Sequence, residues 1–211
     1  TALALTIGAG PSGKPGAIFQ FSAHPKNAKV PAGSFFADAT IDAKAGTIAL
    51  KPYKWLDQPD RRYKMVALEG KLSGRNVIKG KLLKAPGCTT FTVYRNGKGS
   101  RLRWAKGIDG IWTGHYTCAQ GKTALAMTIT GGKKGVFQFA PYRGNSKTPI
   151  GLYATRIKTD GKGAIKIDPA AWKLRPSGYR KVGLEGKLKG KNRMTGKVTW
   201  LDGCTSFQLR R

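Results

Sequence analysis

A nine-residue stretch occurs twice in this chain, and this repetition constrains the fold more than any other feature of the sequence. Residues 66–74 read Val-Ala-Leu-Glu-Gly-Lys-Leu-Ser-Gly, and residues 182–190 read Val-Gly-Leu-Glu-Gly-Lys-Leu-Lys-Gly. The same offset of 116 positions relates Gly80 to Gly196, Cys88 to Cys204 and Phe91 to Phe207. The chain therefore consists of two copies of one module.

Each copy is made of short alternating stretches separated by turn residues, and no stretch has a sustained helical period. This spacing predicts a β-sandwich or a β-barrel. A sequential meander of eight strands closes most simply as an up-and-down barrel, which leaves no free edge. We therefore predict an all-β protein of two tandem homologous modules, each an eight-stranded antiparallel up-and-down barrel. Module one covers residues 1–95, a basic linker covers 96–110, and module two covers 111–211.

The opening strand of module two, residues 111–118, has no counterpart in module one, because residue 1 already aligns with Thr123. Module one has either lost this strand by processing or lacks it naturally. The strand contains Trp112, Gly114 and Tyr116 in a Trp-x-Gly-x-Tyr pattern, and a short alternating strand follows. This pattern resembles the first strands of avidin-like and lipocalin-like barrels, and the resemblance implies a barrel of that kind. It covers one pair of strands and transfers no binding residue.

The three cysteines follow the repeat. Cys88 and Cys204 occupy the same module position, and Cys118 ends the opening strand of module two. The first and last strands of a closed meander are neighbours, so we predict a Cys118–Cys204 disulfide, and the partner of Cys88 would belong to the strand that module one lacks. A bond between Cys88 and Cys118, or three free thiols in a reducing compartment, are the alternatives. A disulfide suits a secreted or periplasmic protein, and the spacing makes a poor zinc site.

The chain is strongly basic, with 39 Lys and Arg against 10 Asp and Glu and a formal net charge of +29. Such a charge attracts polyanions and keeps copies of the protein apart. It predicts a partner such as nucleic acid, lipopolysaccharide, teichoic acid, an acidic polysaccharide or an anionic membrane surface, and an adaptation for solubility is the alternative. No apolar run is long enough for a transmembrane segment. We expect no cofactor and no metal.

The hairpin that follows each glutamate-containing strand is the most basic local feature. The candidate ligand-binding residues there are Lys71 and Arg75 in module one, and Lys187, Lys189, Lys191 and Arg193 in module two. On an extended strand, Lys187, Lys189 and Lys191 point the same way and form one cationic stripe. The alternative is a solvated face whose lysines protect a sheet edge. Repetition in both modules would allow avidity along a polymer.

A loop with an equivalent tryptophan in each module is the second candidate site. Its proposed ligand-binding residues are Trp55, Arg61, Arg62 and Tyr63 in module one, and Trp172, Arg175, Tyr179 and Arg180 in module two. An aromatic face beside cationic groups can stack on a sugar or a base while it holds a phosphate, sulfate or carboxylate. The alternative is that each tryptophan closes one end of its barrel.

Glu69 and Glu185 are the only glutamates, and they occupy the same module position. By alternation they face outward, so we expect ion pairs with a neighbouring strand rather than acid–base chemistry. The sequence contains no familiar hydrolase, phosphate-loop, zinc-protease or dinucleotide motif. We therefore expect a non-enzymatic secreted protein that binds an anionic polymer. An assembly or inhibitor protein that docks on an acidic protein surface is the alternative, and a hydrolase of an anionic substrate is the third hypothesis.

Overall fold

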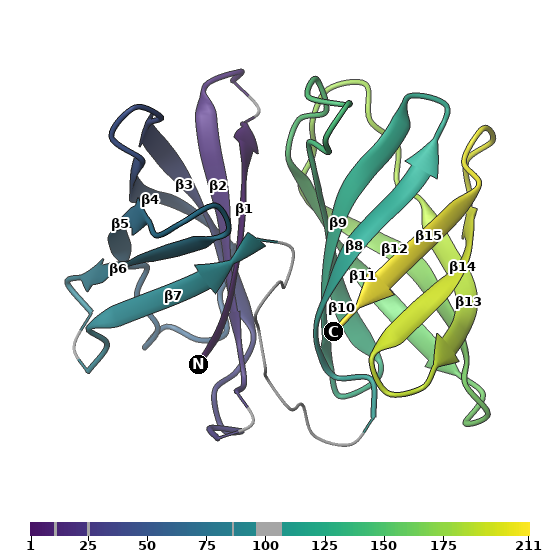
Figure 1. Ribbon diagram of the computed structural model, residues 1–211. Coiled ribbons are helices and arrows are strands. Elements are labelled where there is room, and N and C mark those ends of the chain that lie inside the picture. The colour runs from purple at the N-terminus through teal and green to yellow at the C-terminus, as the bar shows by residue number, and fades with distance from the viewer. Residues whose placement is uncertain (11, 25, 86, 96–106) are drawn as a thin grey trace. The chain divides into compact units, whose positions relative to one another are not determined.

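The computed structural model describes residues 1–10, 12–24, 26–85, 87–95 and 107–211. Its regular elements are all β-strands, and they form two compact units that divide the chain between residues 102 and 103 (Figure 1). Within each unit, every strand pairs antiparallel with the next strand along the chain. These findings confirm the predicted all-β fold of two tandem modules. The described residues include no helix with the length and apolarity that a membrane crossing requires.

Module two is a closed barrel of eight strands. The strands are β8 (Gly110–Cys118), β9 (Gly121–Thr130), β10 (Lys134–Ala140), β11 (Gly151–Thr159), β12 (Ala164–Leu174), β13 (Gly183–Lys189), β14 (Arg193–Thr199) and β15 (Ser206–Arg210). The last strand returns to the first, so that Phe207 lies opposite Tyr116 and Arg210 lies opposite Thr113. Closure leaves no strand edge of this barrel unpaired, as the meander predicted.

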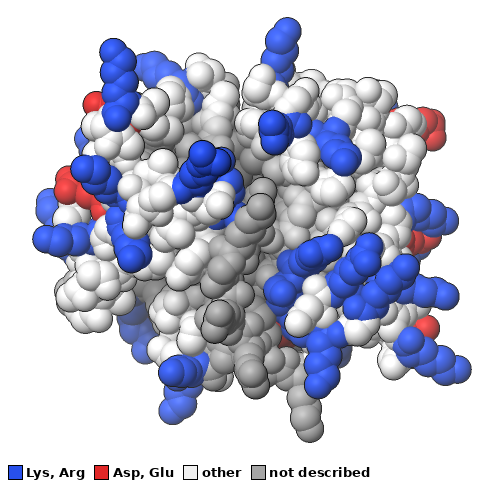
Figure 2. All heavy atoms as spheres, viewed as in Figure 1, with Lys and Arg blue, Asp and Glu red and all other residues white. Residues whose placement is uncertain are grey.

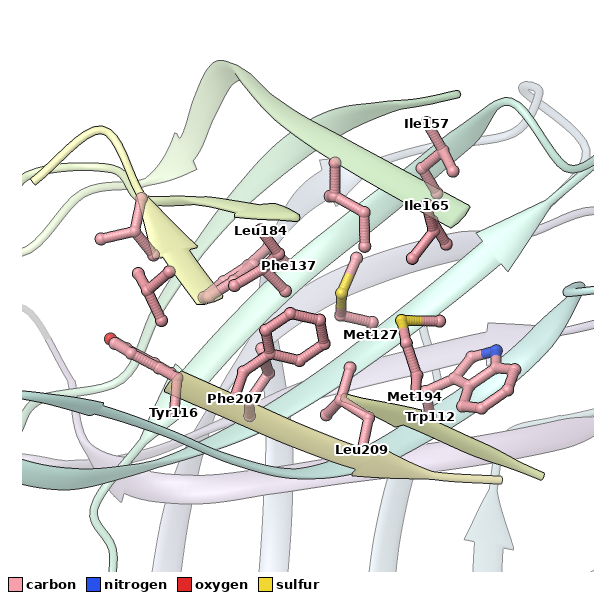
Figure 3. Packing of buried hydrophobic residues seen from close by; sticks show 14 of the residues in the cluster. Trp112, Tyr116, Met127, Phe137, Ile157, Ile165, Leu184, Met194, Phe207 and Leu209 are labelled. Carbon is pink, nitrogen blue, oxygen red and sulfur yellow. The ribbon is translucent and has the colours of Figure 1, made fainter. Parts of the chain in front are cut away.

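The barrel of module two is filled by the inward-facing residues of its strands. Trp112, Phe137, Leu184 and Leu209 each have an exposed fraction of 0%. They come from four different strands and point into the same core (Figure 3). Successive residues of a strand face opposite sides of a sheet, so the alternate positions lie on the outer surface. All the Lys and Arg residues of β13, β14 and β15 lie at these outer positions.

Module one has seven strands in its described residues and is an open sheet. The strands are β1 (Ala2–Ala9), β2 (Pro15–Ser22), β3 (Gly33–Asp42), β4 (Thr47–Asp57), β5 (Ala67–Leu72), β6 (Val77–Leu83) and β7 (Thr90–Tyr94). β7 comes near β1 without pairing with it. Phe35, Leu50 and Leu68 form the centre of its core. Its described residues thus contain no equivalent of β8, which agrees with the sequence prediction.

Strands β4 and β12 extend further than the sequence predicted, because we placed Trp55 and Trp172 in loops. Both tryptophans lie on these strands and pair with the preceding strand. The register shifts by one residue next to Pro52 and next to Pro169. A proline has no amide hydrogen for the strand ladder, so prolines inside sheets occur at bulges. The prolines interrupt the pairing without ending the strands, so the loop interpretation was wrong for the two tryptophans, whereas Tyr63 and Tyr179 do lie in the loops that follow.

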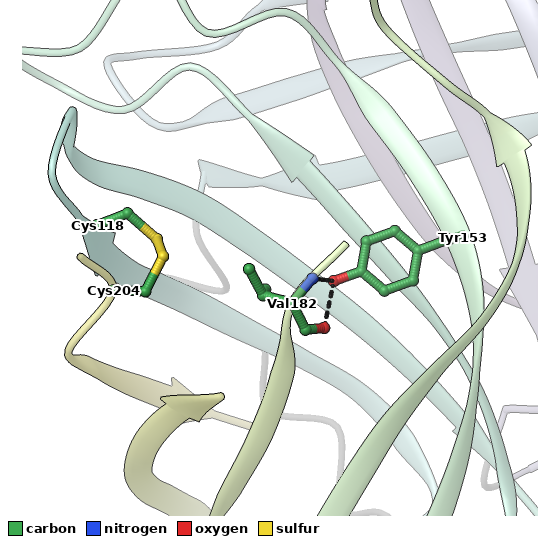
Figure 4. The surroundings of a disulfide bond; sticks show 4 residues. All are labelled: Cys118, Tyr153, Val182 and Cys204. Carbon is green, nitrogen blue, oxygen red and sulfur yellow. Dashed lines mark hydrogen bonds between the residues drawn. A yellow bond between two sulfur atoms is a disulfide. The ribbon is translucent and has the colours of Figure 1, made fainter. Parts of the chain in front are cut away.

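A disulfide joins Cys118, the last residue of β8, to Cys204 in the loop before β15 (Figure 4). This confirms the predicted pair, and the alternative bond between Cys88 and Cys118 is not formed. Cys88 is a free and exposed thiol. In the same module, the Tyr153 hydroxyl donates a hydrogen bond to the Val182 carbonyl at 2.8 Å (Figure 4).

The predicted linker falls largely on residues 96–106, which lie outside the described residues. Its last residues belong to module two. The carboxylate of Asp109 accepts hydrogen bonds from the amides of Gly131 and Gly132, at 2.9 and 2.7 Å. Asp109, two positions before the predicted start of module two at residue 111, is therefore tied to the β9–β10 turn of that module.

Candidate basic binding surface

Three neighbouring strands of module two carry a row of basic residues on their outer face. Lys189 of β13 lies opposite Arg193 of β14, and Arg193 lies opposite Arg210 of β15. All three residues are exposed, and neighbouring strands are about 4.8 Å apart. Figure 2 shows Lys and Arg side chains gathered over this part of module two. We call this row, together with the exposed Lys187 on the same side of β13, the basic face.

No acidic side chain in the described part of the chain forms an ion pair with the basic face. The neighbouring outward carboxylate is Glu185, and it already holds Lys166 at 3.1 Å and Lys197 at 3.2 Å. Like charges directly opposite one another destabilise a sheet. We therefore expect the row to lower the stability of the barrel.

Glu185 has a structural role. Hydrogen bonds from Lys166 and then from Lys197 hold its pKa below the usual value for a glutamate. The ion pair with Glu185 raises the pKa of Lys166. The predicted ion-pair role is therefore confirmed for Glu185. In module one, Glu69 lies opposite Lys81 at the matching place in the sheet.

The matching hairpin of module one, β5–β6, carries a smaller basic surface. Lys71 lies opposite Lys79, and Arg75 lies in the turn between the two strands. All three side chains are exposed. The positions that match Arg193 and Arg210 are held by uncharged residues of β6 and β7. The two modules therefore share a basic hairpin, but the row itself belongs to module two, because Ser73, Val77 and Tyr94 occupy its three positions in module one.

Lys191 does not belong to the cationic stripe that the sequence predicted. β13 ends at Lys189, and Lys191 lies in the turn that leads to β14. Its carbonyl accepts a hydrogen bond from the Arg211 guanidinium at 2.7 Å. The Arg211 guanidinium carbon lies 4.9 Å from the centre of the Trp112 ring, within the range of a cation–π contact. The alternation argument failed here because the chain reverses direction at Gly190.

The predicted tryptophan site of module two faces the core. The Trp172 ring meets the rings of Phe139 and Tyr153 edge-on, with centroid distances of 6.3 and 5.1 Å. Tyr179 stacks on Phe139 at 5.5 Å. Both Trp172 and Tyr179 are half-buried and pack against the core cluster. These contacts favour the alternative in which Trp172 closes the end of the barrel.

Module one repeats this arrangement. Trp55 meets the ring of Phe35 edge-on at 5.5 Å, and Tyr63 stacks on Phe21 at 5.9 Å. Both residues pack against the core of module one while remaining partly exposed. The same aromatic packing in two copies is what a structural role predicts.

The four arginines proposed beside the tryptophans are all exposed. Arg62 is held by Asp60 at 2.9 Å, and the hydrogen bond between them raises the pKa of Arg62. Arg61, Arg175 and Arg180 form no ion pair within the described chain. In module two, Arg175 and Arg180 are therefore exposed cations without an ion pair among the described residues, whereas the Trp172 indole that we expected beside them faces the core.

Trp200 is an exposed aromatic residue that our sequence analysis did not single out. Its exposed fraction is 65%, and its backbone φ is 75°, a conformation that is costly for a bulky residue. The indole lies against Gly183, where an added Cβ would come 2.7 Å from the indole Cδ1. Module one has Ala67 and Lys84 at the matching positions. The two positions differ together between the modules, and this joint difference is the sequence feature that could have identified Trp200.

Comparisons with protein families, with curated proteins and with solved structures gave no match for this chain. Its surface is therefore interpreted from geometry and charge. The basic face offers several cations in a row to an anion, and Trp200 offers a flat ring on which a sugar or base can stack.

Proposed function

We propose that this protein binds an anionic polymer, such as a cell-envelope glycan, lipopolysaccharide or nucleic acid, and does not catalyse a reaction on it. The row of Lys189, Arg193 and Arg210 carries the proposal, because it holds three cations side by side with no acidic partner among the described residues. A polyanion would supply the missing counter-charges and relieve the repulsion within the row. The net charge of +29 supports the same class of ligand, since it attracts polyanions over long distances.

Two further features suit a polymer. The hairpin of module one, with Lys71, Lys79 and Arg75, offers a second contact to the same chain of anions. Two linked contacts bind a polymer more tightly than either contact alone. Trp200, rather than Trp172, is the residue whose exposed ring can add selectivity.

We place the protein outside the cytosol, as a secreted or periplasmic protein. The Cys118–Cys204 disulfide supports this location, because such bonds persist in oxidising compartments.

The test is a binding titration against heparin, double-stranded DNA and lipopolysaccharide at low and physiological salt. The test variant replaces the row by glutamine: Lys189→Gln, Arg193→Gln and Arg210→Gln. The matched control removes the same net charge from the β10–β11 loop and from β11: Arg143→Gln, Lys147→Gln and Lys158→Gln. The test variant should weaken binding more than the control. With DNA, the plot of the logarithm of the binding constant against the logarithm of the salt concentration should become shallower for the test variant. Its slope should decrease in magnitude by about 0.9 for each lost phosphate contact.

Equal losses in the two variants would show that binding follows the net charge and not the basic face. The absence of binding to every polymer at low salt would contradict the proposal. Binding to one acidic protein at a fixed ratio would instead favour the docking alternative.

A further inference from the structure

The exposed ring of Trp200 lies at one end of a strand whose other end carries the basic row. β13 begins at Gly183 and ends at Lys189. Gly183 faces outward by alternation along the strand, and the Trp200 indole covers it. Six positions at about 3.3 Å per residue place the ring and the row about 20 Å apart. We call the outer face of β13, with Glu185 and Lys187 between these two ends, the strand track.

The Trp200 ring is held at a cost that its packing does not repay. The turn gives its residue a positive φ in both modules, 75° for Trp200 and 55° for Lys84. A bulky aromatic residue is a costly choice there, and Trp200 stays 65% exposed, so burial recovers little of the cost. Costly backbone conformations of this kind cluster at ligand sites. Because an exposed flat ring can stack on a sugar or a base, Trp200 has the properties of a ligand contact.

The middle of the strand track is polar but not uniformly basic. Lys187 lies opposite Thr195, and Thr195 lies opposite Gln208, so uncharged hydrogen-bonding groups flank the track. Glu185 lies on the track itself, and its side chain is 34% exposed although two lysines hold it. A carboxylate accepts hydrogen bonds from hydroxyl groups and repels phosphates that come close. This middle part therefore suits a chain that is rich in hydroxyl groups.

A nucleic acid fits this arrangement less well. Proteins that bind single strands stack successive bases on several aromatic side chains. Trp200 is the only exposed aromatic residue in the described part of module two. The bases of a duplex are stacked on one another, so they present edges in the grooves and no free face to the indole. One ring, one carboxylate and a row of cations instead match a chain of sugars that carries anionic groups.

We propose, as a refinement that rests on the polyanion binding proposed above, that the ligand is a linear anionic polysaccharide that lies along the strand track. One sugar ring stacks on Trp200, and hydroxyl groups of the following sugars bond to Glu185. Sulfate or carboxylate groups further along meet Lys189, Arg193 and Arg210, whose arginines offer paired N–H donors to such oxyanions. The bound part of the ligand therefore spans about 20 Å, and its affinity depends on both ends.

The full chain can be titrated with a heparin dodecasaccharide at low salt, with calorimetry and tryptophan fluorescence as the measurements. Trp200→Gly keeps the net charge and should weaken binding about tenfold, the size of loss that one stacked ring gives. The fluorescence change on binding should largely disappear in this variant. Trp200→Phe keeps a ring and should retain most of the affinity. Tyr53→Ala, which removes an exposed aromatic residue from β4 of module one, is the matched control and should leave the affinity unchanged.

Two nucleic acid ligands identify what the ring contacts. Duplex DNA should bind Trp200→Gly as well as it binds the wild type, because a duplex offers no free ring face. A single-stranded oligonucleotide that lost more affinity than the dodecasaccharide in this variant would show that the ring stacks on bases, and would overturn the proposal of a polysaccharide.

The outcomes also separate this proposal from the one on which it rests. If substitution of the basic row weakens dodecasaccharide binding while Trp200→Gly does not, the protein binds polyanions but the ligand does not follow the strand track. If none of these polyanions binds the wild type, both proposals fail.

Discussion

Gly186 of β13 lies directly opposite Gly196 of β14, and an added Cβ at Gly196 would come 2.4 Å from the Gly186 Cα and 2.0 Å from the Glu185 carbonyl oxygen. The two backbones therefore approach too closely for a side chain at this point. Gly70 and Gly80 form the same pair in module one. The Glu-Gly step that marks the repeat thus specifies an outward carboxylate followed by a close contact between strands.

The Gly196→Ala variant should be less stable than the wild type by about 1–3 kcal/mol, because the added methyl group forces the two strands apart. Urea denaturation followed by circular dichroism measures this free energy of unfolding. Thr195→Ala, one position earlier on the same strand, is the control and should change stability much less. If Gly196→Ala left the midpoint of the urea transition unchanged, the close approach of the two strands would not affect the stability of the barrel.

The Cys118–Cys204 bond should be the main covalent contribution to the stability of module two. It spans 86 positions, and its removal should cost about 4 kcal/mol, because the unfolded chain gains conformational entropy. Thermal unfolding with and without a reductant measures this cost. Cys88→Ser should melt as the wild type does in both conditions. A melting temperature that does not respond to reduction would contradict this prediction.

The sequence repeat was sufficient to predict most of the architecture. Aligning Cys88 with Cys204 identified the cysteine that Cys118 would meet, since the first and last strands of a closed meander are neighbours. The outward position of Glu185 and its ion pairs also followed from alternation. These inferences depend on sequence period and on neighbouring strands, which a repeat reveals directly.

Other features depend on contacts that the sequence pattern does not contain. Trp172 was placed in a loop, although a bulge next to Pro169 lets β12 continue to Leu174. Arg211 ties the turn at Lys191 to the barrel from a distant part of the chain. The exposed ring of Trp200 depends on a left-handed backbone and on the missing side chain of Gly183. Each of these features is set by local geometry or by distant partners, not by hydrophobic period.

Removing one member of the basic row should stabilise the barrel while it weakens polymer binding. Lys189→Gln or Arg193→Gln should raise the free energy of unfolding by about 0.2–1 kcal/mol at low salt, because like charges across strands repel. The gain should shrink at high salt, where the repulsion is screened. Lys197→Gln is the control on β14, and it should not stabilise, because Lys197 pairs with Glu185. Destabilisation by Arg193→Gln at low salt would contradict the assignment of an unneutralised row.

Module two should lose stability in alkali. Burial raises the pKa of Tyr116 and that of Tyr153 far above the usual value of 10. The folded state therefore keeps both protons above pH 10, while the unfolded chain releases them, and stability falls as the pH rises. Urea titrations above about pH 10 should show a loss of up to about 1.4 kcal/mol per pH unit for each tyrosine. Tyr116→Phe should make this dependence shallower, and an unchanged slope would show that Tyr116 ionises in the folded state.

Substitutions of Trp172 and Trp200 should distinguish a tryptophan that stabilises the fold from one that contacts the polymer. Trp172→Ala should destabilise module two by about 3–5 kcal/mol, because it leaves a cavity beside Phe139 and Tyr153. Trp200→Gly should be neutral or stabilising by up to about 1 kcal/mol, because glycine adopts the positive φ without strain and little buried surface is lost. Thermal unfolding measures both effects, and polymer titration of the folded variants should show reduced selectivity only for Trp200→Gly. If Trp172→Ala remained stable and lost binding, the ring of Trp172 would be a ligand contact, and its packing against the core would be secondary.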